Sequence, residues 1–312
     1  MIAAAEVKNS LLKNELIIFA SDYGKKAIAE SWTIRLSKQV KKLDQFKDFE
    51  NYNIATGGDT LVVDVDLDCS EALLLADHFL PNTKLEFGRA STPRAHRLLK
   101  VIDLTKKHTR KFWDFKGEEK SMLVEVRANK HYTMALGQYD NGEKVVWNSI
   151  GEPTEINWDT LLKNTALLSA ACVVLRKYPK PLSKMRNEYL KLMVAALWQH
   201  KVEKEDCIKI INAVTAKSQD EDRSARVEDI YKRERTEQIQ GLPKLAEQFN
   251  WSEDEVKDIK KLLYKITGRD ALPAFTHEFT KRVVYMMKQK KYYDLEDKEM
   301  YDGEAIDVKY SR

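Results

Sequence analysis

The chain has 312 residues, 43% of them hydrophobic and 33% charged, with a formal net charge of +4 at pH 7. This length suffices for one large or two medium domains, and the mild charge means that any nucleic-acid surface must come from local basic patches. Cys69, Cys172 and Cys207 lack paired spacing, which argues against a disulfide framework or a zinc ribbon and fits a reducing cytosol. Without an apolar run of membrane-spanning length or a signal-peptide pattern, we expect a soluble, cytoplasmic protein with no membrane partner.

The segment Leu61–Ser70, LVVDVDLDCS, places Asp64, Asp66 and Asp68 at every second position of an apolar, β-branched run. Such alternation predicts a strand with all three carboxylates on one face of a sheet. Carboxylates this close repel one another unless a cation neutralises them. Oxygen ligands suit Mg²⁺ or Mn²⁺, and paired ions of this kind activate an attacking oxygen and stabilise a leaving phosphate oxygen. The alternative is a solvated edge strand with its acidic side chains turned outward.

A second motif is the loop Phe87–His96, FGRASTPRAH, which combines a glycine turn, two arginines, a hydroxyl group and a histidine. It follows a helix expected over Ser70–Phe79 and precedes the apolar pair Leu98 and Leu99. Arginine offers phosphate oxygens a planar fork of donors, serine adds a hydroxyl and a loop amide, and histidine adds a ring N–H. The composition therefore suits a polyphosphate, and the alternative is an ordinary polar loop.

A further short strand is predicted at Met122–Arg127, MLVEVR, with Glu125 inside it. A lone glutamate in a strand commonly faces solvent, but this one is available as a further metal ligand beside the aspartates. Downstream, Asn141-Gly142 between apolar runs predicts a tight hairpin turn before Trp147.

Two stretches, 106–113 and 281–293, mix cations with aromatic rings. Proteins that bind single strands use this mixture, because bases stack on the rings and phosphates pair with the cations. The alternative for each stretch is a solvated helix or loop face. Four further histidines have no partners at ligand spacing and are assigned to packing or to the surface: His78, His131, His200 and His277.

Beyond Asn157 the apolar periodicity is helical. A break at Tyr178–Pro181 interrupts it, Ser252 and Glu255 are spaced for a capping box, and Gly268 suits a helix C-cap. The expected helices are Trp158–Leu175, Leu190–Trp198, Glu203–Ala216, Ser224–Thr236, Leu242–Phe249, Glu253–Thr267 and Phe275–Lys291. The expected organisation is an α+β region at 1–157, a connecting helix and proline-containing linker at 158–182, a helical bundle at 183–291 and a charged tail at 292–312.

The motifs of the first half also occur together in a known family. In chain order they are Thr56-Gly57-Gly58 leading to Asp64-Val65-Asp66, then Phe87-Gly88-Arg89 with Ser91 and His96, then Glu125. Their order, spacing and apolar flanks resemble the archaeo-eukaryotic primase superfamily, and within it the bifunctional primase-polymerases of phages, plasmids and mobile elements. The serine and histidine that the family often carries after its third motif are missing from 136–140.

The second half resembles the small helical domain that commonly follows the catalytic core in this family. The corresponding segments are Arg186, Leu190–Trp198, Ile208–Val214, Asp220–Asp222 and Gly241–Leu245. In many relatives a P-loop helicase comes next, but this chain contains no G-x-x-x-x-G-K-[ST] sequence. We therefore expect a protein that acts alone or one segment of a longer polypeptide.

The resemblance implies an α+β primase-polymerase core, with an RRM-like palm sheet and a second α/β module, followed by an all-α helical bundle. It implies a DNA primase/polymerase that performs template-directed, two-metal nucleotidyl transfer on single-stranded DNA, with primer-free initiation as an option. The implied partners are a single-stranded DNA template, NTPs or dNTPs, a primer strand, and a replicative helicase on a separate or longer chain. The implied location is the cytoplasm of a prokaryotic or phage-infected cell.

The resemblance also implies roles for individual residues. Asp64, Asp66 and Glu125 would hold two Mg²⁺ or Mn²⁺ ions, with Asp68 as an alternative partner for Asp66 in place of Asp64. The triphosphate would be held by Arg89, Ser91 and His96, with Arg94 and Lys100 as further candidates.

Two other classes of function remain open at the level of sequence. A two-metal nuclease could use the same acidic cluster, but it would need no triphosphate-binding loop. A non-catalytic replication-initiation or DNA-binding module is the other alternative, and metal-dependent nucleotide incorporation would exclude it.

Overall fold

The computed structural model describes residues 2–21, 39–47, 51–115, 122–180, 183–218, 220, 223–233, 241–267, 283–286, 291–294 and 299–301. It combines α-helices with mainly antiparallel sheets, which confirms the mixed helix and strand content expected from the sequence. By their contacts the residues form two units, 1–267 and 268–312. No helix in the described part of the chain is both long enough and apolar enough to cross a membrane.

The first sheet of the large unit has four antiparallel strands in the order β2-β1-β3-β9. Their bounds are β1 Ile18–Ser21, β2 Gln39–Val40, β3 Asn51–Thr56 and β9 His131–Leu136. Helix α1, Ala4–Lys13, contributes Val7 and Leu11 to the apolar cluster that also contains Ile18 and Ile54 of this sheet. The short 3-10 helices η1, Leu43–Gln45, and η2, Gly58–Thr60, flank β3 in the chain.

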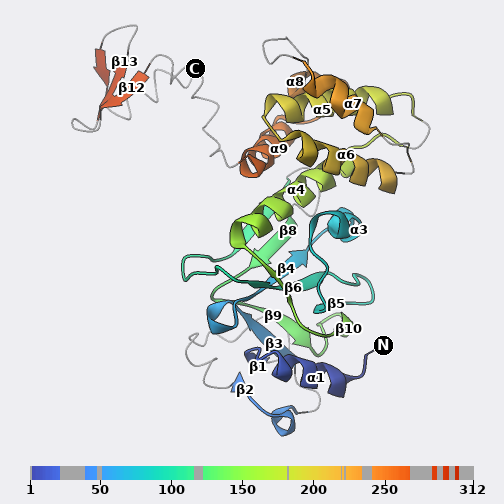
Figure 1. Cartoon of the computed structure of the whole chain (residues 1–312), viewed down its shortest axis with the longest axis vertical. Helices are drawn as coiled ribbons and strands as arrows, with labels where there is room; N and C mark the ends of the chain where they lie inside the picture. The colour runs from blue at the N-terminus through green and yellow to red at the C-terminus, as the bar shows by residue number, and fades with distance from the viewer. Residues whose placement is uncertain are drawn as a thin grey trace. The chain divides into compact units, whose positions relative to one another are not determined.

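The second sheet has the order β10-β5-β6-β4-β8-β7, and a seventh strand, β11, pairs in parallel with β6. The bounds are β4 Val62–Leu67, β5 Glu86–Gly88, β6 His96–Val101, β7 Lys111–Asp114, β8 Met122–Arg127, β10 Val146–Ser149 and β11 Thr154–Ile156. The strand predicted around the aspartates is therefore β4, and it lies between β6 and β8 in the interior of the sheet (Figure 1). The alternative of a solvated edge strand is wrong.

The two faces of β4 have different surroundings. Val63, Val65 and Leu67 belong to the large apolar core, to which helices α3, Ser70–Phe79, and α4, Trp158–Arg176, also contribute. Because side chains alternate along a strand, Asp64 and Asp66 project from the opposite face, which is the face of Val62 and of the apolar cluster of the first sheet. The alternating sequence thus separates a core face from a polar face.

Helix α4 continues the core of the second sheet into the helical part of the unit (Figure 1). It packs against α3, α6 and α9, and Arg176 near its end pairs with Glu71 of α3 at 2.9 Å. The other helices are α5 Arg186–Gln199, α6 Lys204–Lys217, α7 Ser224–Tyr231, α8 Leu242–Phe249 and α9 Glu253–Ile266. Their apolar side chains join those of the sheet in one continuous cluster.

The helix predictions are largely confirmed within this unit. The capping box of α9 forms as expected, because Ser252 N donates to Glu255 Oε2 at 2.8 Å and Glu255 N donates to Ser252 Oγ at 3.2 Å. Helix α7 ends at Tyr231, whereas the sequence predicted a helix to Thr236, which lies outside the described residues. The expected C-cap Gly268 also lies outside them.

The small unit corrects one prediction. A helix was expected over Phe275–Lys291, but the structure has strands β12, Val283–Met286, and β13, Lys291–Asp294, in an antiparallel sheet with β14, Glu299–Tyr301. The expected helical bundle at 183–291 and charged tail at 292–312 therefore both contain strand. Valine and tyrosine have high β propensity, and the pairing of these strands outweighs the helical spacing of apolar residues in the segment. Residues 275–282 lie outside the described part of the chain.

Candidate functional site

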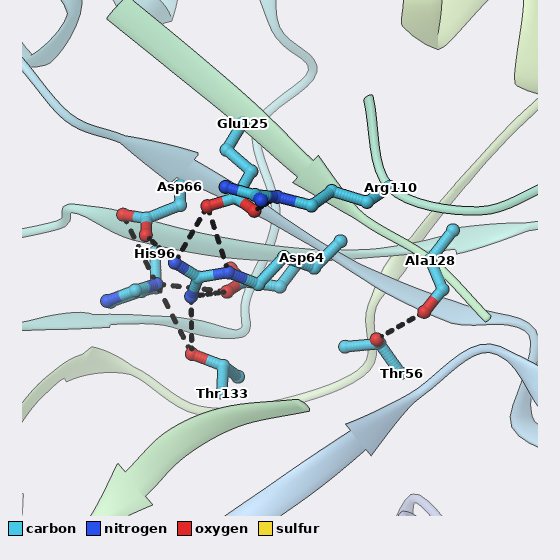
Figure 2. Close-up of polar contacts among 9 residues, drawn as sticks. Thr56, Asp64, Asp66, His96, Arg110, Glu125, Ala128 and Thr133 are labelled. Atoms are coloured by element: carbon cyan, nitrogen blue, oxygen red, sulfur yellow. Dashed lines mark hydrogen bonds and ion pairs between the residues drawn. The ribbon is translucent and has the colours of Figure 1, made fainter. Parts of the chain in front are cut away.

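The register of three central strands brings the motifs of the first half together. Asp66 of β4 lies opposite His96 of β6 on one side and opposite Glu125 of β8 on the other. Figure 2 shows Asp64, Asp66, His96 and Glu125 converging on one face of this sheet. Residues that are 59 positions apart in the chain (66 to 125) become neighbours through strand pairing alone.

Three carboxylates form a group that could hold a metal ion. Oxygens of Asp66, Asp68 and Glu125 all lie within 4.8 Å of one another. Asp68 follows the end of β4, and its backbone N–H donates to Leu123 O at 3.1 Å, which keeps it beside β8. Burial and the neighbouring charge of Asp66 raise the pKa of Asp68 to about 7. A divalent cation would relieve this repulsion, and an all-oxygen donor set suits Mg²⁺ or Mn²⁺.

Asp64 lies outside that group. It is fully buried, and its Oδ2 accepts hydrogen bonds from His96 Nδ1 at 3.0 Å and from Arg127 Nη1 at 3.3 Å. Burial acts to raise the pKa of Asp64, but the charges of His96 and Arg127 outweigh it and hold the pKa below its ordinary value. The sequence favoured Asp64 as the partner of Asp66, whereas the structure places Asp68 with Asp66 and Glu125 and leaves Asp64 to orient His96.

His96 is held in one orientation. Its ring stacks on Phe87 with 4.6 Å between centroids, and its contacts to Asp64, Asp66 and Thr133 all involve Nδ1. Burial acts to lower the pKa of His96, but the charges of Asp64 and Asp66 and the bond to Asp64 outweigh it and raise the pKa. With Nδ1 engaged, Nε2 is the nitrogen that remains to donate to a ligand in the cavity that His96 lines.

Two arginines lie among the carboxylates: the sequence did not predict Arg127 as a site residue, and it predicted Arg110 only as part of the basic stretch 106–113. The Arg127 guanidinium pairs with Asp66, with Glu125 at 2.9 Å and with Asp64 at 3.3 Å, and Arg110 pairs with Glu125. Burial acts to lower the pKa of Arg127, but the surrounding carboxylates outweigh it and raise the pKa, so the side chain stays charged. Arg127 follows Glu125 by two positions on one strand, and this period-two spacing was the signal available in the sequence.

The predicted triphosphate residues separate into two sets. Arg89 and His96 line the same cavity as the carboxylates, and Ser91 lies outside this lining with its hydroxyl bonded to Glu143 at 2.9 Å. Arg94 pairs instead with Asp77 and Glu86, both at 2.8 Å, and Lys100 pairs with Glu155 at 2.9 Å. Neither Arg94 nor Lys100 lines the cavity.

The turn at Phe87-Gly88-Arg89 explains how Arg89 reaches the cavity. Arg89 and Thr92 exchange two backbone hydrogen bonds of 3.1 Å, and a Cβ at Gly88 would lie 2.2 Å from Thr92 O, so only glycine fits there. The Arg89 guanidinium then lies 4.7 Å from the centroid of the Tyr139 ring. Its Nε also donates to Thr92 Oγ1 at 3.3 Å, and its Nη1 lies 3.5 Å from Glu143 Oε2. These contacts hold a cation at the edge of the cavity.

A second glycine turn connects the two sheets through hydrogen bonds. Thr56 Oγ1 donates to Ala128 O at 2.6 Å (Figure 2), and Gly58 N donates to Asn129 Oδ1 at 2.8 Å. Gly57 has a φ of 77°, and a Cβ there would lie 2.5 Å from Asn129 Oδ1. The Thr-Gly-Gly motif therefore joins β3 to β4 in a turn that requires glycine.

The cavity between these elements has a volume of about 750 Å³, which falls in the usual range for small-molecule sites. The second sheet and its loops supply its charged side chains, which are Asp66, Asp68, Arg89, His96, Arg110, Glu125 and Arg127. The first sheet and the hairpin after it supply Asn53, His131, Tyr132, Thr133, Met134 and Tyr139. His131, which the sequence assigned to packing or the surface, thus faces the cavity, and burial lowers its pKa.

Residues of the basic stretch at 106–113 have two different roles: one is structural, and another lies at the cavity. The His108 ring stacks on Trp158 with centroids 4.6 Å apart, and its Nδ1 accepts from Thr105 N at 3.1 Å, so this histidine is structural. Arg110 instead reaches the cavity, and its guanidinium lies 5.3 Å from the centroid of the exposed Phe112 ring. An exposed aromatic ring beside a cation at the cavity suits a nucleic-acid strand.

Comparison of the sequence with protein-family models gave no match, and comparison with curated proteins gave none either.

Proposed function

We propose that this protein is a metal-dependent nucleotidyltransferase of the primase-polymerase type, which copies single-stranded DNA from NTPs or dNTPs. The observation that carries the proposal is the charge arrangement of one cavity, in which Asp66, Asp68 and Glu125 form an acidic cluster beside the cations of Arg89 and Arg110. An acidic cluster supplies metal ligands, and adjacent guanidinium groups supply donors to a triphosphate. The cavity volume of about 750 Å³ suits a nucleotide.

In this proposal Asp66, Asp68 and Glu125 hold Mg²⁺ or Mn²⁺, which when bound activates the attacking hydroxyl and neutralises phosphate charge. His96 donates from Nε2 to a phosphate oxygen, because Asp64 engages Nδ1 and the raised pKa of His96 favours the ring form that carries a proton on both nitrogens. Arg89 donates its fork of N–H groups to the same triphosphate. Asp64 acts through His96 and touches no substrate.

The test is nucleotide incorporation on a single-stranded template with Mg²⁺ or Mn²⁺, with and without a primer. We expect extension of a supplied primer by the wild-type protein and about 100- to 1,000-fold less by Asp66→Asn. Glu155→Gln is the matched control, because Glu155 is an exposed carboxylate that pairs with Lys100 outside the cavity. Shortening of the labelled strand instead of extension would show a nuclease and overturn the proposal.

One observation favours a second candidate, a non-catalytic nucleic-acid-binding module. Arg127 and Arg110 already pair with the carboxylates of the acidic cluster, as a bound cation would. If these arginines keep metal away, the protein binds single-stranded DNA with the same affinity in Mn²⁺ and in chelator and incorporates no nucleotide. Metal-dependent incorporation excludes this candidate.

A further inference from the structure

The two walls of the cavity differ in charge. Its carboxylates and arginines belong to the second sheet and its loops, whereas the first sheet contributes uncharged groups such as Asn53, Tyr132 and Met134. A nucleoside triphosphate is divided in the same way, with a polyanion at one end and a neutral sugar and base at the other. The charged wall therefore suits the triphosphate, and the neutral wall suits the nucleoside.

Asn53 is the notable side chain of the neutral wall. It lies on β3 between Phe19 of β1 and Met134 of β9, and only 3% of it is exposed. Its Nδ2 atom is buried and has no hydrogen-bond partner among the described residues, although the side chain lines the cavity. A buried donor without an acceptor destabilises a folded protein, so its presence beside a cavity points to an acceptor supplied by a ligand.

Asn51, two positions earlier on the same strand, shows the ordinary alternative. It is also buried, but its Nδ2 donates to Gln138 O at 2.9 Å and its Oδ1 accepts from Gln138 N at 2.8 Å. The side-chain amide of Asn51 thus stabilises the fold by bonding to the backbone of Gln138. The same residue type on the same strand therefore has a structural role at one position and an unpaired donor at the other.

We propose that Asn53 is a nucleoside-binding residue, whose Nδ2 donates a hydrogen bond to the sugar or base of the incoming nucleotide. This inference rests on the proposed function. An amide N–H cannot be a metal ligand, and the phosphates are better served by the arginines of the opposite wall. Acceptors common to all nucleotides are the sugar oxygens and, on the base, O2 of pyrimidines or N3 of purines. A donor to any of these would serve a polymerase that must accept every base.

The experiment is isothermal titration of the full chain with ATP, dATP and inorganic triphosphate in the presence of Mn²⁺. The variants are Asn53→Leu and Asn53→Ala, with Asn51→Ala as the control. We expect both Asn53 variants to bind ATP about 2- to 12-fold more weakly, the loss of one neutral hydrogen bond, and inorganic triphosphate with unchanged affinity. A loss with ATP but not dATP would identify the 2′-hydroxyl as the acceptor, and equal losses would identify an acceptor common to both.

Thermal unfolding without ligand gives a second readout. Asn53→Leu should unfold at the same temperature as the wild type or higher, because it removes an unpaired buried donor, whereas Asn51→Ala should unfold at a lower temperature. Wild-type affinity for ATP in both Asn53 variants, or equal losses for ATP and inorganic triphosphate, would overturn the role of Asn53 alone. A wild-type protein that binds neither ATP nor inorganic triphosphate would overturn the proposed function itself.

Discussion

Two clusters of carboxylates and arginines, on and beside the second sheet, differ in their balance of charge. In the first, Arg94 and Arg97 pair with Asp77 and Glu86, with 2.7 Å between Arg97 Nη2 and Asp77 Oδ1. We name it the balanced cluster. In the second, the site cluster, Arg110, Arg127 and His96 face four carboxylates, and a cavity of about 750 Å³ adjoins them. The four are Asp64, Asp66, Asp68 and Glu125.

The pKa shifts of the two clusters differ in the same way. Burial acts to raise the pKa of Asp77, but hydrogen bonds from Arg94 and Arg97 outweigh it and lower the pKa. For Asp68, burial and the charge of Asp66 prevail over Arg127 and raise the pKa to about 7. A cluster whose charges already cancel stabilises the fold, whereas one with excess carboxylate is suited to bind a further cation.

The largest expected difference between the clusters concerns activity. Asp66→Asn should reduce nucleotide incorporation about 100- to 1,000-fold, the usual effect of removing one electrostatic stabiliser from an active site. Asp77→Asn should leave incorporation near the wild-type level, because Asp77 lies outside the cavity. Primer extension at saturating nucleotide measures both, and equal losses in the two variants would remove the distinction between the clusters.

The second prediction compares the central arginines. Arg127→Met leaves Asp64, Asp66 and Glu125 without their shared partner, so without metal the free energy of unfolding should fall by about 3–5 kcal/mol. Mn²⁺ should restore part of this loss, because a bound cation replaces the guanidinium charge. Arg97→Met should also destabilise the protein, but Mn²⁺ should restore nothing. Urea unfolding with Mn²⁺ and with chelator tests this, and recovery of Arg97→Met by Mn²⁺ would contradict it.

The third prediction compares two arginines of one loop, Arg89 and the further candidate Arg94. Arg89→Ala should weaken triphosphate binding by about 1.5–3 kcal/mol, the range for hydrogen bonds to charged groups. Arg94→Ala should leave triphosphate binding unchanged and lower the melting temperature, because Arg94 pairs with Asp77 and Glu86. Measuring the affinity for inorganic triphosphate and the melting temperature of each variant tests this prediction. Weaker triphosphate binding by Arg94→Ala would contradict it and would place this side chain in the site.

The sequence predicted the parts of the site that follow from strand alternation. Because side chains alternate along a strand, the spacing of the aspartates predicts which face of β4 carries Asp66. The same alternation on β8 predicts that Glu125 and Arg127 share one face, although only Glu125 was predicted as a site residue. Antiparallel pairing then places His96 beside them. These residues could be predicted because the alternation of side chains along a strand determines which face of the sheet each one occupies.

The remaining parts depend on contacts between distant segments. The partners of Arg94 and Lys100 are Asp77 of α3 and Glu155 of β11, and no local pattern shows that these carboxylates will be adjacent. The choice between Asp64 and Asp68 depends on where β4 ends relative to β8. Asn53 lies on β3 outside the Thr56-Gly57-Gly58 motif that ends this strand, and it reaches the cavity only because two sheets face each other.

The smallest expected effect is a pH dependence of opposite sign in the two clusters. The pKa of Asp68 in the folded, metal-free protein is about 7, against an ordinary value of 3.8. Between these values the folded state keeps a proton that the unfolded state has lost, so stability falls as the pH rises through this range and remains lower above it. Asp68→Asn removes this fall in stability, because asparagine does not titrate. In chelator its melting temperature should therefore exceed that of the wild type at pH 8 by a few degrees, and by less at pH 5.

Asp77→Asn is the control for this prediction, because Asp77 has a pKa below its ordinary value. A lowered pKa contributes stability that is present above the unfolded-state pKa and is lost only as the pH falls through the folded-state pKa. Both pH 5 and pH 8 lie above that range, so Asp77→Asn should lower the melting temperature equally at both. If Asp68→Asn behaves like Asp77→Asn, the carboxylates of the site cluster are already balanced by Arg127 and Arg110, and the electrostatic reason for a metal ion there disappears.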